Sequence, residues 1–76
     1  MPKVLIYTTP TCIFCGMAKE FFKKNHVTYH EKDVSADEHA IREMVARSHQ
    51  LGVPVIDIDG AIVVGFDEKR LQSLLS

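Results

Sequence analysis

The sequence predicts an α/β fold in which a four-stranded mixed sheet is covered by three helices, in the chain order β-α-β-α-β-β-α. Two observations predict this architecture. A strand pattern, a helical pattern and a second strand pattern follow one another over residues 3–34, which is the arrangement of a βαβ unit with a right-handed crossover. A strong hairpin signal at Asp59-Gly60 then predicts that the last two strands are antiparallel.

The composition is that of one compact domain. The chain has 76 residues, of which 46% are hydrophobic, and no linker, repeat or low-complexity tract interrupts it, so we expect a single domain over residues 1–76. Nine basic and ten acidic residues give a formal net charge of −1, which argues against binding to nucleic acid or to a membrane surface. We therefore expect a monomer whose partners are small molecules or protein thiols.

The βαβ unit begins with the short apolar run Lys3–Tyr7 and continues with a helix. We expect Thr11 to be the N-cap of this helix and Asn25 to end it. The next segment, Val27–Val34, alternates weakly and is rich in polar residues, which is typical of a strand near a sheet edge; we expect it to be parallel to the first. The helix carries apolar residues at helical spacing, namely Phe14, Met17, Ala18, Phe21 and Phe22.

A second helix is predicted from the capping-box spacing of Ser35 and Glu38, and we expect it to run to about Ser48. An arginine near the site end of this helix could contact a substrate carboxylate. Otherwise three charged residues form the expected solvated side: Arg42, Glu43 and Arg47. The four histidines are scattered without ligand spacing, so we interpret them as surface or partly packed residues.

The last third of the sequence predicts a hairpin and a third helix. Leu51–Ile58 has a strand pattern, Asp59-Gly60 suits the two positive φ angles of a type I′ turn, and Ala61–Val64 returns as the antiparallel partner. Asp67 is a good N-cap for the final helix. Its leucines are expected to face the core: Leu71, Leu74 and Leu75.

Both cysteines of the chain, Cys12 and Cys15, lie at the junction between the first strand and the first helix, with two residues between them. Unpaired N–H groups at a helix start stabilise an anion, and the thiolate is the form of cysteine that attacks a disulfide. We therefore expect Cys12 to be the attacking sulfur and Cys15, further into the first turn, to be the sheltered resolving thiol. Dithiol–disulfide exchange requires such a pair, with one thiolate to attack the substrate and a second thiol to release the product.

Three other interpretations of the pair are less well supported. Half of a zinc site would need a second cysteine pair or a close histidine pair, and the sequence contains neither. A structural disulfide across so short a loop would constrain the unfolded chain very little. Two inert buried cysteines would not need to stand at a helix start.

With these elements in place, the sequence resembles a glutaredoxin, a member of the thioredoxin-fold family. The matching pieces cover nearly the whole chain in the order of the family: Ile6–Cys15, Arg47-Ser48, Val53-Pro54 and Val64–Asp67. The resemblance implies a thioredoxin fold, with the sheet ordered 2-1-3-4 and a cis peptide bond before Pro54 that faces the cysteine pair. It also implies a thiol–disulfide oxidoreductase with no metal and no tightly bound cofactor.

The resemblance further implies a groove for glutathione as co-substrate. The backbone of Val53 would pair with the tripeptide, and the start of the last helix with Asp67 would receive its γ-glutamyl end, although Asp67 could also be a plain helix cap. Gln50 could supply a neutral contact. The residues expected to form this groove are Thr9, Phe14, Gln50, Val53, Pro54, Gly65, Phe66 and Asp67. Glutathionylated or disulfide-bonded proteins would be the other partners.

Two positions depart from the family. Ile13-Phe14 stand between the cysteines where Pro-Tyr is usual, and Thr9 stands where a lysine commonly helps to hold the glycine carboxylate of glutathione. These departures leave two alternatives open. One is a glutaredoxin-like hydrogen donor to ribonucleotide reductase, reduced by thioredoxin reductase. The other is a scaffold in which glutathione and Cys12 of two copies hold an iron–sulfur cluster.

The expected location is the cytoplasm. Met1-Pro2-Lys3 leads directly into a short strand, which is not the pattern of a signal peptide, and the sequence has no apolar stretch of about 20 residues that would span a membrane. In a reducing compartment a close cysteine pair is more often catalytic than structural.

Overall fold

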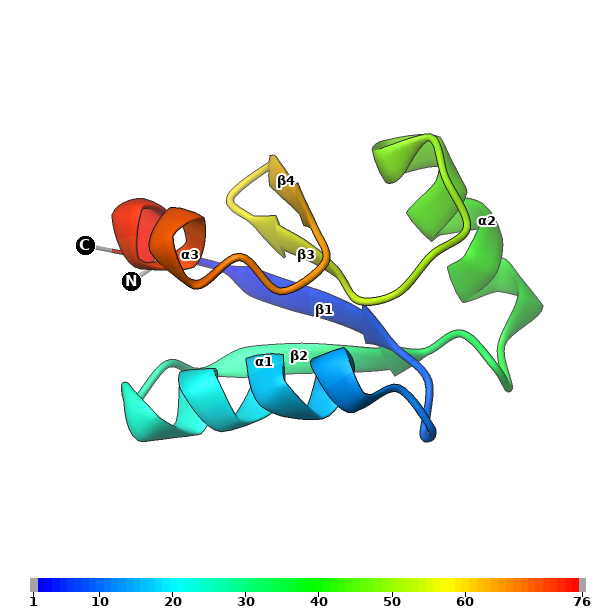
Figure 1. Ribbon diagram of the computed structural model, residues 1–76. Coiled ribbons are helices and arrows are strands. Elements are labelled where there is room, and N and C mark those ends of the chain that lie inside the picture. The colour runs from blue at the N-terminus through cyan, green and yellow to red at the C-terminus, as the bar shows by residue number, and fades with distance from the viewer. Residues whose placement is uncertain (1, 76) are drawn as a thin grey trace.

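The computed structural model describes residues 2–75 and has the predicted order of elements around one sheet (Figure 1). The elements are β1 (Val4–Thr8), α1 (Ile13–Lys24), β2 (Tyr29–Asp33), α2 (Glu38–Ser48), β3 (Val55–Ile58), β4 (Ala61–Val64) and α3 (Glu68–Leu75). The strand order is β2-β1-β3-β4, with β1 parallel to β2 and antiparallel to β3, and β3 antiparallel to β4. The predicted mixed sheet and its order are confirmed.

Helices cover both faces of this sheet, because side chains alternate along each strand. Ile6 of β1 points to one face, where it belongs to a core cluster with Phe22 of α1 and Leu71 of α3. Tyr7 points to the other face and belongs to a second cluster with Met44 of α2. The cysteine pair lies at the end of β1, where the chain passes from the sheet into α1.

The hairpin and the last helix have their predicted form. Asp59 and Gly60 have φ angles of 51° and 93°, as the two central residues of a type I′ turn require, and β4 has the predicted bounds. The Asp67 carboxylate accepts a hydrogen bond from the backbone N–H of Arg70 at 3.2 Å, which confirms it as a cap of α3. Leu71 is buried in the core, as predicted, and the other two leucines pack against the same cluster.

The start of α2 differs from the prediction, because its N-cap is Asp37 and not Ser35. The Asp37 carboxylate accepts two backbone N–H groups of the first turn, at 3.0 and 3.2 Å. Ser35 instead donates its backbone N–H and its hydroxyl to the carboxylate of Asp33, at 2.9 and 2.6 Å. The capping-box prediction is therefore wrong, whereas the end of the helix at Ser48 is confirmed.

Two strands are shorter than their sequence patterns. β2 begins at Tyr29 because the preceding segment closes α1, where the backbone N–H of Val27 donates to the carbonyl of Phe22 at 2.8 Å. β3 begins at Val55, directly after Pro54, which has no N–H for a ladder bond. The first residues of both predicted strands are therefore loop.

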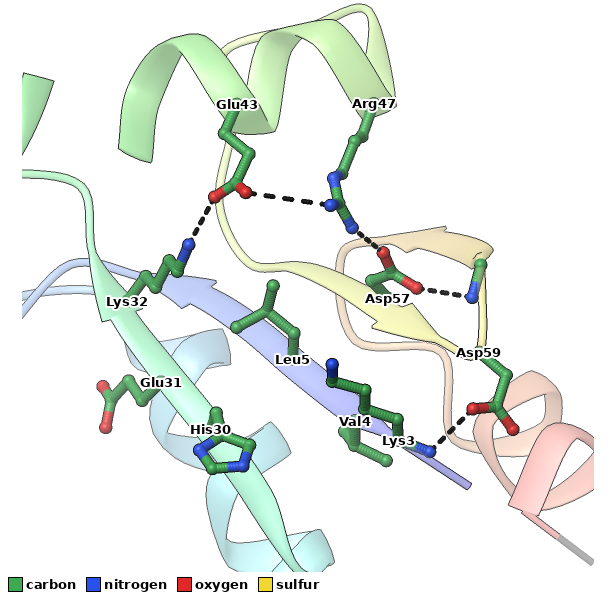
Figure 2. Close-up of a pocket in the computed structure, with 11 residues that line it drawn as sticks. Lys3, Val4, Leu5, His30, Glu31, Lys32, Glu43, Arg47, Asp57 and Asp59 are labelled. Carbon is green, nitrogen blue, oxygen red and sulfur yellow. Dashed lines mark hydrogen bonds and ion pairs between the residues drawn. The ribbon is translucent and has the colours of Figure 1, made fainter. Parts of the chain in front are cut away.

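Ion pairs join α2 to the sheet (Figure 2). Arg47 donates to the carboxylate of Asp57 on β3, and Glu43 accepts from Lys32 on β2 at 2.6 Å. Arg47 also lies 3.7 Å from Glu43, so the charges form one chain across the helix. Glu43 and Arg47 are thus not the simple solvated side that the sequence predicts, and Arg47 has a carboxylate partner within the fold.

The helices of the described chain are short. The longest, α1, has 12 residues, and none of those formed by residues 2–75 is long and apolar enough to pass through a membrane.

Candidate functional site

Cys12 is the N-cap of α1, a role that the sequence assigned to Thr11. Its sulfur accepts the backbone N–H of Cys15 at 3.3 Å, in the way that a serine or aspartate oxygen caps a helix. The prediction for Thr11 is therefore wrong, and the correction strengthens the chemical argument. The Cys12 sulfur itself receives the N–H that a helix start offers to an anion.

The other neighbour of the Cys12 sulfur is the carbonyl oxygen of Val53, which is 3.8 Å away and accepts from the thiol. Val53 precedes Pro54, and the peptide bond between them is cis, as the resemblance implies. The backbone N–H of Gly65 donates to the carbonyl of Pro54 at 2.8 Å. Three residues of the expected groove, Val53, Pro54 and Gly65, are thus brought together at the reacting end of α1.

Cys15 is sheltered, as a resolving thiol should be. Its side chain is only 1% exposed, while Cys12 is partly exposed, and both are free thiols. Burial, followed by the hydrogen bond with Cys12, raises the pKa of Cys15 to about 11, and the backbone of Thr9 and the charge of Lys19 oppose the rise. At neutral pH the Cys15 thiol is therefore protonated, and it must lose its proton before it can attack a disulfide.

This raised pKa predicts the pH dependence of the resolving step. When Cys12 is held in a mixed disulfide with an aromatic thiol, Cys15 must ionise before it can attack Cys12 and release that thiol. Only the thiolate attacks, so the rate of release should rise about tenfold per pH unit and keep rising above pH 9, because burial, the largest cause of the raised pKa, remains when Cys12 is blocked. Stopped-flow measurement of the released thiol checks this, and a plateau already at pH 8–9 would contradict the assignment.

A polar network fixes α1 to the sheet next to Cys15, and the sequence analysis missed it. The buried hydroxyl of Thr8 donates to the carboxylate of Glu31 at 2.6 Å, and Lys19 donates to the same oxygen at 2.9 Å. The hydrogen bond from Thr8 and then that from Lys19 lower the pKa of Glu31. Strand alternation could have suggested this, since Thr8 and Glu31 share the sheet face that α1 covers.

The other expected groove residues have contacts of different kinds, and only Thr9 among them is hydrogen-bonded to a cysteine of the pair. The carbonyl of Thr9 accepts the backbone N–H of Cys12 at 3.3 Å. Phe66 is half-buried and packs edge-on against Phe21, with ring centroids 6.0 Å apart. Asp67 caps α3, as described above. Phe66 and Asp67 follow Gly65 directly, so the hydrogen bond from Gly65 to the Pro54 carbonyl joins the chain just before α3 to the Val53-Pro54 segment.

Gln50 is engaged within its own loop. Its amide nitrogen donates to the carbonyl of Gly52 at 2.9 Å, and its amide oxygen accepts the backbone N–H of Gly52 at 2.6 Å. A contact between Gln50 and glutathione stays a prediction, and it would have to replace these two bonds.

Large apolar side chains are exposed around the cysteines. Phe14 and Met17, which share the helical spacing of the core residues, are 57% and 44% exposed, while Phe21 and Phe22 are buried as predicted. Both residues lie in the first turns of α1, on the side of the helix that faces solvent. Within residues 2–75, the exposed large apolar residues are Ile13, Phe14, Met17, Leu51 and Val64.

A groove of about 730 Å³ lies on the α2 side of the sheet, away from the cysteines (Figure 2). Figure 2 shows that the ion pairs of Glu43, Arg47 and Asp57 form part of its wall. The hydroxyl of Tyr7 is buried near these charges without a hydrogen-bond partner among residues 2–75. Burial, and then the neighbouring Glu43, raise the pKa of Tyr7 to about 12. This groove belongs to the packing of α2, and the nucleophiles lie elsewhere.

No metal site is built into the part of the chain that the structure describes: no group of three or more His, Cys, Asp or Glu side chains in residues 2–75 could hold a metal ion.

Comparisons with known proteins agree with thiol chemistry at the cysteine pair. The Glutaredoxin family model matches residues 4–63. The chain is 40% identical over 72 residues to an uncharacterized glutaredoxin-like 8.6 kDa protein in the rubredoxin operon of Clostridium pasteurianum, with 95% of this chain and 96% of the relative covered. It is 34% identical over 68 residues to Glutaredoxin 3 of Escherichia coli K12, covering 90% of this chain and 82% of that one. The crystal structure of the T8A mutant of the thioredoxin-like protein BC3987 is similar, with a TM-score of 0.91, 39% identity, and 99% and 96% of the two chains covered.

Proposed function

The chain belongs to the glutaredoxin family and is a thiol–disulfide oxidoreductase, and from this premise we propose that it is a glutathione-linked enzyme whose Cys12/Cys15 dithiol reduces protein disulfides and glutathione mixed disulfides. The observation that carries the proposal is the asymmetry of the pair. Cys12 is partly exposed and receives a backbone N–H on its sulfur, whereas Cys15 is buried with a raised pKa. Glutathione acts as co-substrate, and no tightly bound cofactor is needed.

Reduction of a protein disulfide would take two steps. The Cys12 thiolate attacks one sulfur of the substrate, a mixed disulfide forms, and the first substrate sulfur leaves as a thiolate that takes up a proton. Cys15 then loses its proton and attacks the Cys12 sulfur, which forms the Cys12–Cys15 disulfide and expels the second substrate sulfur. The N–H contact of 3.3 Å between the backbone of Cys15 and the Cys12 sulfur supports this order, because the two residues are already adjacent.

The start of α3 supports a role for Asp67 in glutathione binding. Its carboxylate caps the helix through Oδ1, at 3.2 Å from the backbone nitrogen of Arg70, which leaves Oδ2 for the α-amino group of a γ-glutamyl residue. The N–H groups of the first turn favour a carboxylate beside it. The carbonyl of Val53 lies 3.8 Å from the Cys12 sulfur, and this closeness supports pairing between the Val53 backbone and the cysteine of a bound glutathione.

The electron source tests the proposal. We expect the oxidised protein to be reduced by millimolar glutathione with glutathione reductase, and to turn over a small glutathione mixed disulfide. The same protein should be assayed in parallel with thioredoxin reductase. Fast reduction by thioredoxin reductase alone, with no reduction by glutathione, would contradict the role of glutathione as electron source. The oxidoreductase chemistry of the two cysteines would be unaffected by that result.

The variant Asp67→Asn sharpens this test, because an amide oxygen can still cap α3 while the charge is lost. The apparent KM for the glutathione mixed disulfide should rise by about three- to tenfold with a smaller change in kcat, since the contact is to a part of the substrate that does not react. Asp37→Asn is the matched control, because Asp37 caps α2 in the same way. A fall in kcat at unchanged KM would contradict the binding role.

The exposed apolar residues favour a second candidate function. Ile13, Phe14 and Leu51 are all more than half exposed near the reacting sulfur, and such a surface suits a protein better than a charged tripeptide. A hydrogen donor to ribonucleotide reductase that is reduced by thioredoxin reductase would use the same two cysteines. The parallel assay above distinguishes the two functions.

A further inference from the structure

The loop between α2 and β3 is held by side-chain hydrogen bonds in place of a sheet ladder. The amide of Gln50 bonds both the N–H and the C=O of Gly52, at 2.6 and 2.9 Å. The hydroxyl of Ser48 donates to the carbonyl of Gln50 at 3.1 Å, and also to that of Met44 at 2.7 Å. We call the reciprocal pair between the Gln50 amide and the Gly52 backbone the Gln50 clasp.

The clasp requires a glycine at its centre. A Cβ atom at position 52 would lie 2.7 Å from the amide oxygen of Gln50, which is closer than real Cβ contacts. A side chain on residue 52 would therefore push the Gln50 amide away and break the pair. A substitution at either Gln50 or Gly52 would therefore break the same pair of hydrogen bonds.

The Gln50 clasp stands directly before the backbone that faces the nucleophile. Val53 follows Gly52, and its carbonyl oxygen is 3.8 Å from the Cys12 sulfur. On the far side, the carbonyl of Pro54 is held by the N–H of Gly65 at 2.8 Å. Without the clasp, the exposed Gly52 would lose both hydrogen bonds to Gln50, and the Val53 backbone would be held only by the packing of its side chain against the core cluster and by the bond at Pro54. A loop that must be ordered when substrate arrives costs conformational entropy at that moment.

We propose that Gln50 is a positioning residue for thiol–disulfide exchange, because its clasp on Gly52 holds the Val53 backbone in the geometry against which a substrate disulfide docks beside Cys12. Gln50 acts through the backbone and does not touch the reacting atoms. The inference rests on Cys12 as the attacking sulfur and not on the source of electrons.

The test uses reduction of a protein disulfide such as insulin, with dithiothreitol as the electron source. Gln50→Ala and Gly52→Ala should each raise the apparent KM for insulin by about three- to tenfold and change kcat by less than about twofold, because docking is impaired while the thiols are unchanged. The double variant should be no worse than either single variant, since both remove the same clasp. Gln72→Ala, on the exposed side of α3, is the matched control.

Two further measurements separate positioning from loss of the fold. Thermal unfolding should show each variant folded at the assay temperature, and the rate of Cys12 alkylation by iodoacetamide should stay at the wild-type value, because that small reagent needs no docked backbone. Unchanged KM in Gln50→Ala, or additive effects in the double variant, would overturn the proposal. If a variant without Cys12 still reduced insulin, the assignment of the nucleophile would fail instead, which is a different result.

Discussion

Cys12→Ser should abolish thiol–disulfide exchange, leaving less than about 1% of the wild-type rate with every disulfide substrate. The serine hydroxyl is not ionised near neutral pH and cannot form the mixed disulfide through which exchange proceeds. Both the glutathione mixed disulfide and insulin should therefore go unreduced, whichever reductant is supplied. Steady-state assays of the two substrates measure the loss.

This substitution should leave the fold intact, which makes the result easy to interpret. Cys12 caps α1 by accepting the backbone N–H of Cys15, and serine is among the best N-cap residues. The helix content and the midpoint of thermal unfolding should stay close to those of the wild type. Retained turnover of either substrate in a folded Cys12→Ser protein would mean that Cys15 is the attacking sulfur.

The parts of the fold that could be predicted depend on neighbours in the sequence. The type I′ turn at Asp59-Gly60 needs positive φ at two adjacent residues, and β4 follows with the predicted bounds because the turn sets the register of the hairpin. Asp67 could be predicted as a cap for the same reason, since a cap acts on N–H groups within its own helix turn.

The errors at the other helix starts have a common physical cause. Thr11, Ser35 and Asp37 are all acceptable caps, and local preference alone cannot choose among them. The choice is made by competing contacts among nearby residues: the Cys12 sulfur accepts the backbone N–H of Cys15 at the start of α1, and Asp33 binds Ser35 so that Asp37 is left to start α2.

The cysteine pair could be predicted as a site, but not the contacts that support it. Lys19 and Glu31 belong to different elements, and their pairing depends on how α1 crosses the sheet. The Gln50 clasp joins residues that are close in the sequence. The sequence still could not predict it, because a glutamine that bonds its own loop and a glutamine that binds a ligand have the same side chain. From the sequence, Gln50 is a candidate for a neutral contact with glutathione in place of the missing lysine, and the structure places its amide on Gly52.

Cys15→Ser should separate two activities that the wild-type protein combines. Removal of glutathione from a mixed disulfide needs only Cys12 and a second molecule of glutathione, so it should be retained within about twofold. Reduction of an intramolecular protein disulfide needs Cys15 to release the trapped substrate, and it should fall by at least about tenfold. The contact from residue 15 to the Cys12 sulfur is made by a backbone N–H, so the substitution does not remove it.

Cys15→Ala is the control for this experiment, because a serine hydroxyl in a position that is 1% exposed would have to find a partner or weaken the fold. The two variants should separate the activities in the same way if the missing thiol is the cause. After a single turnover with insulin, mass spectrometry should detect a mixed disulfide between Cys12 and the substrate that persists in both variants and is absent from the wild type. Equal loss of both activities, without this trapped species, would show that Cys15 is not the resolving thiol and that its burial and raised pKa belong to packing alone.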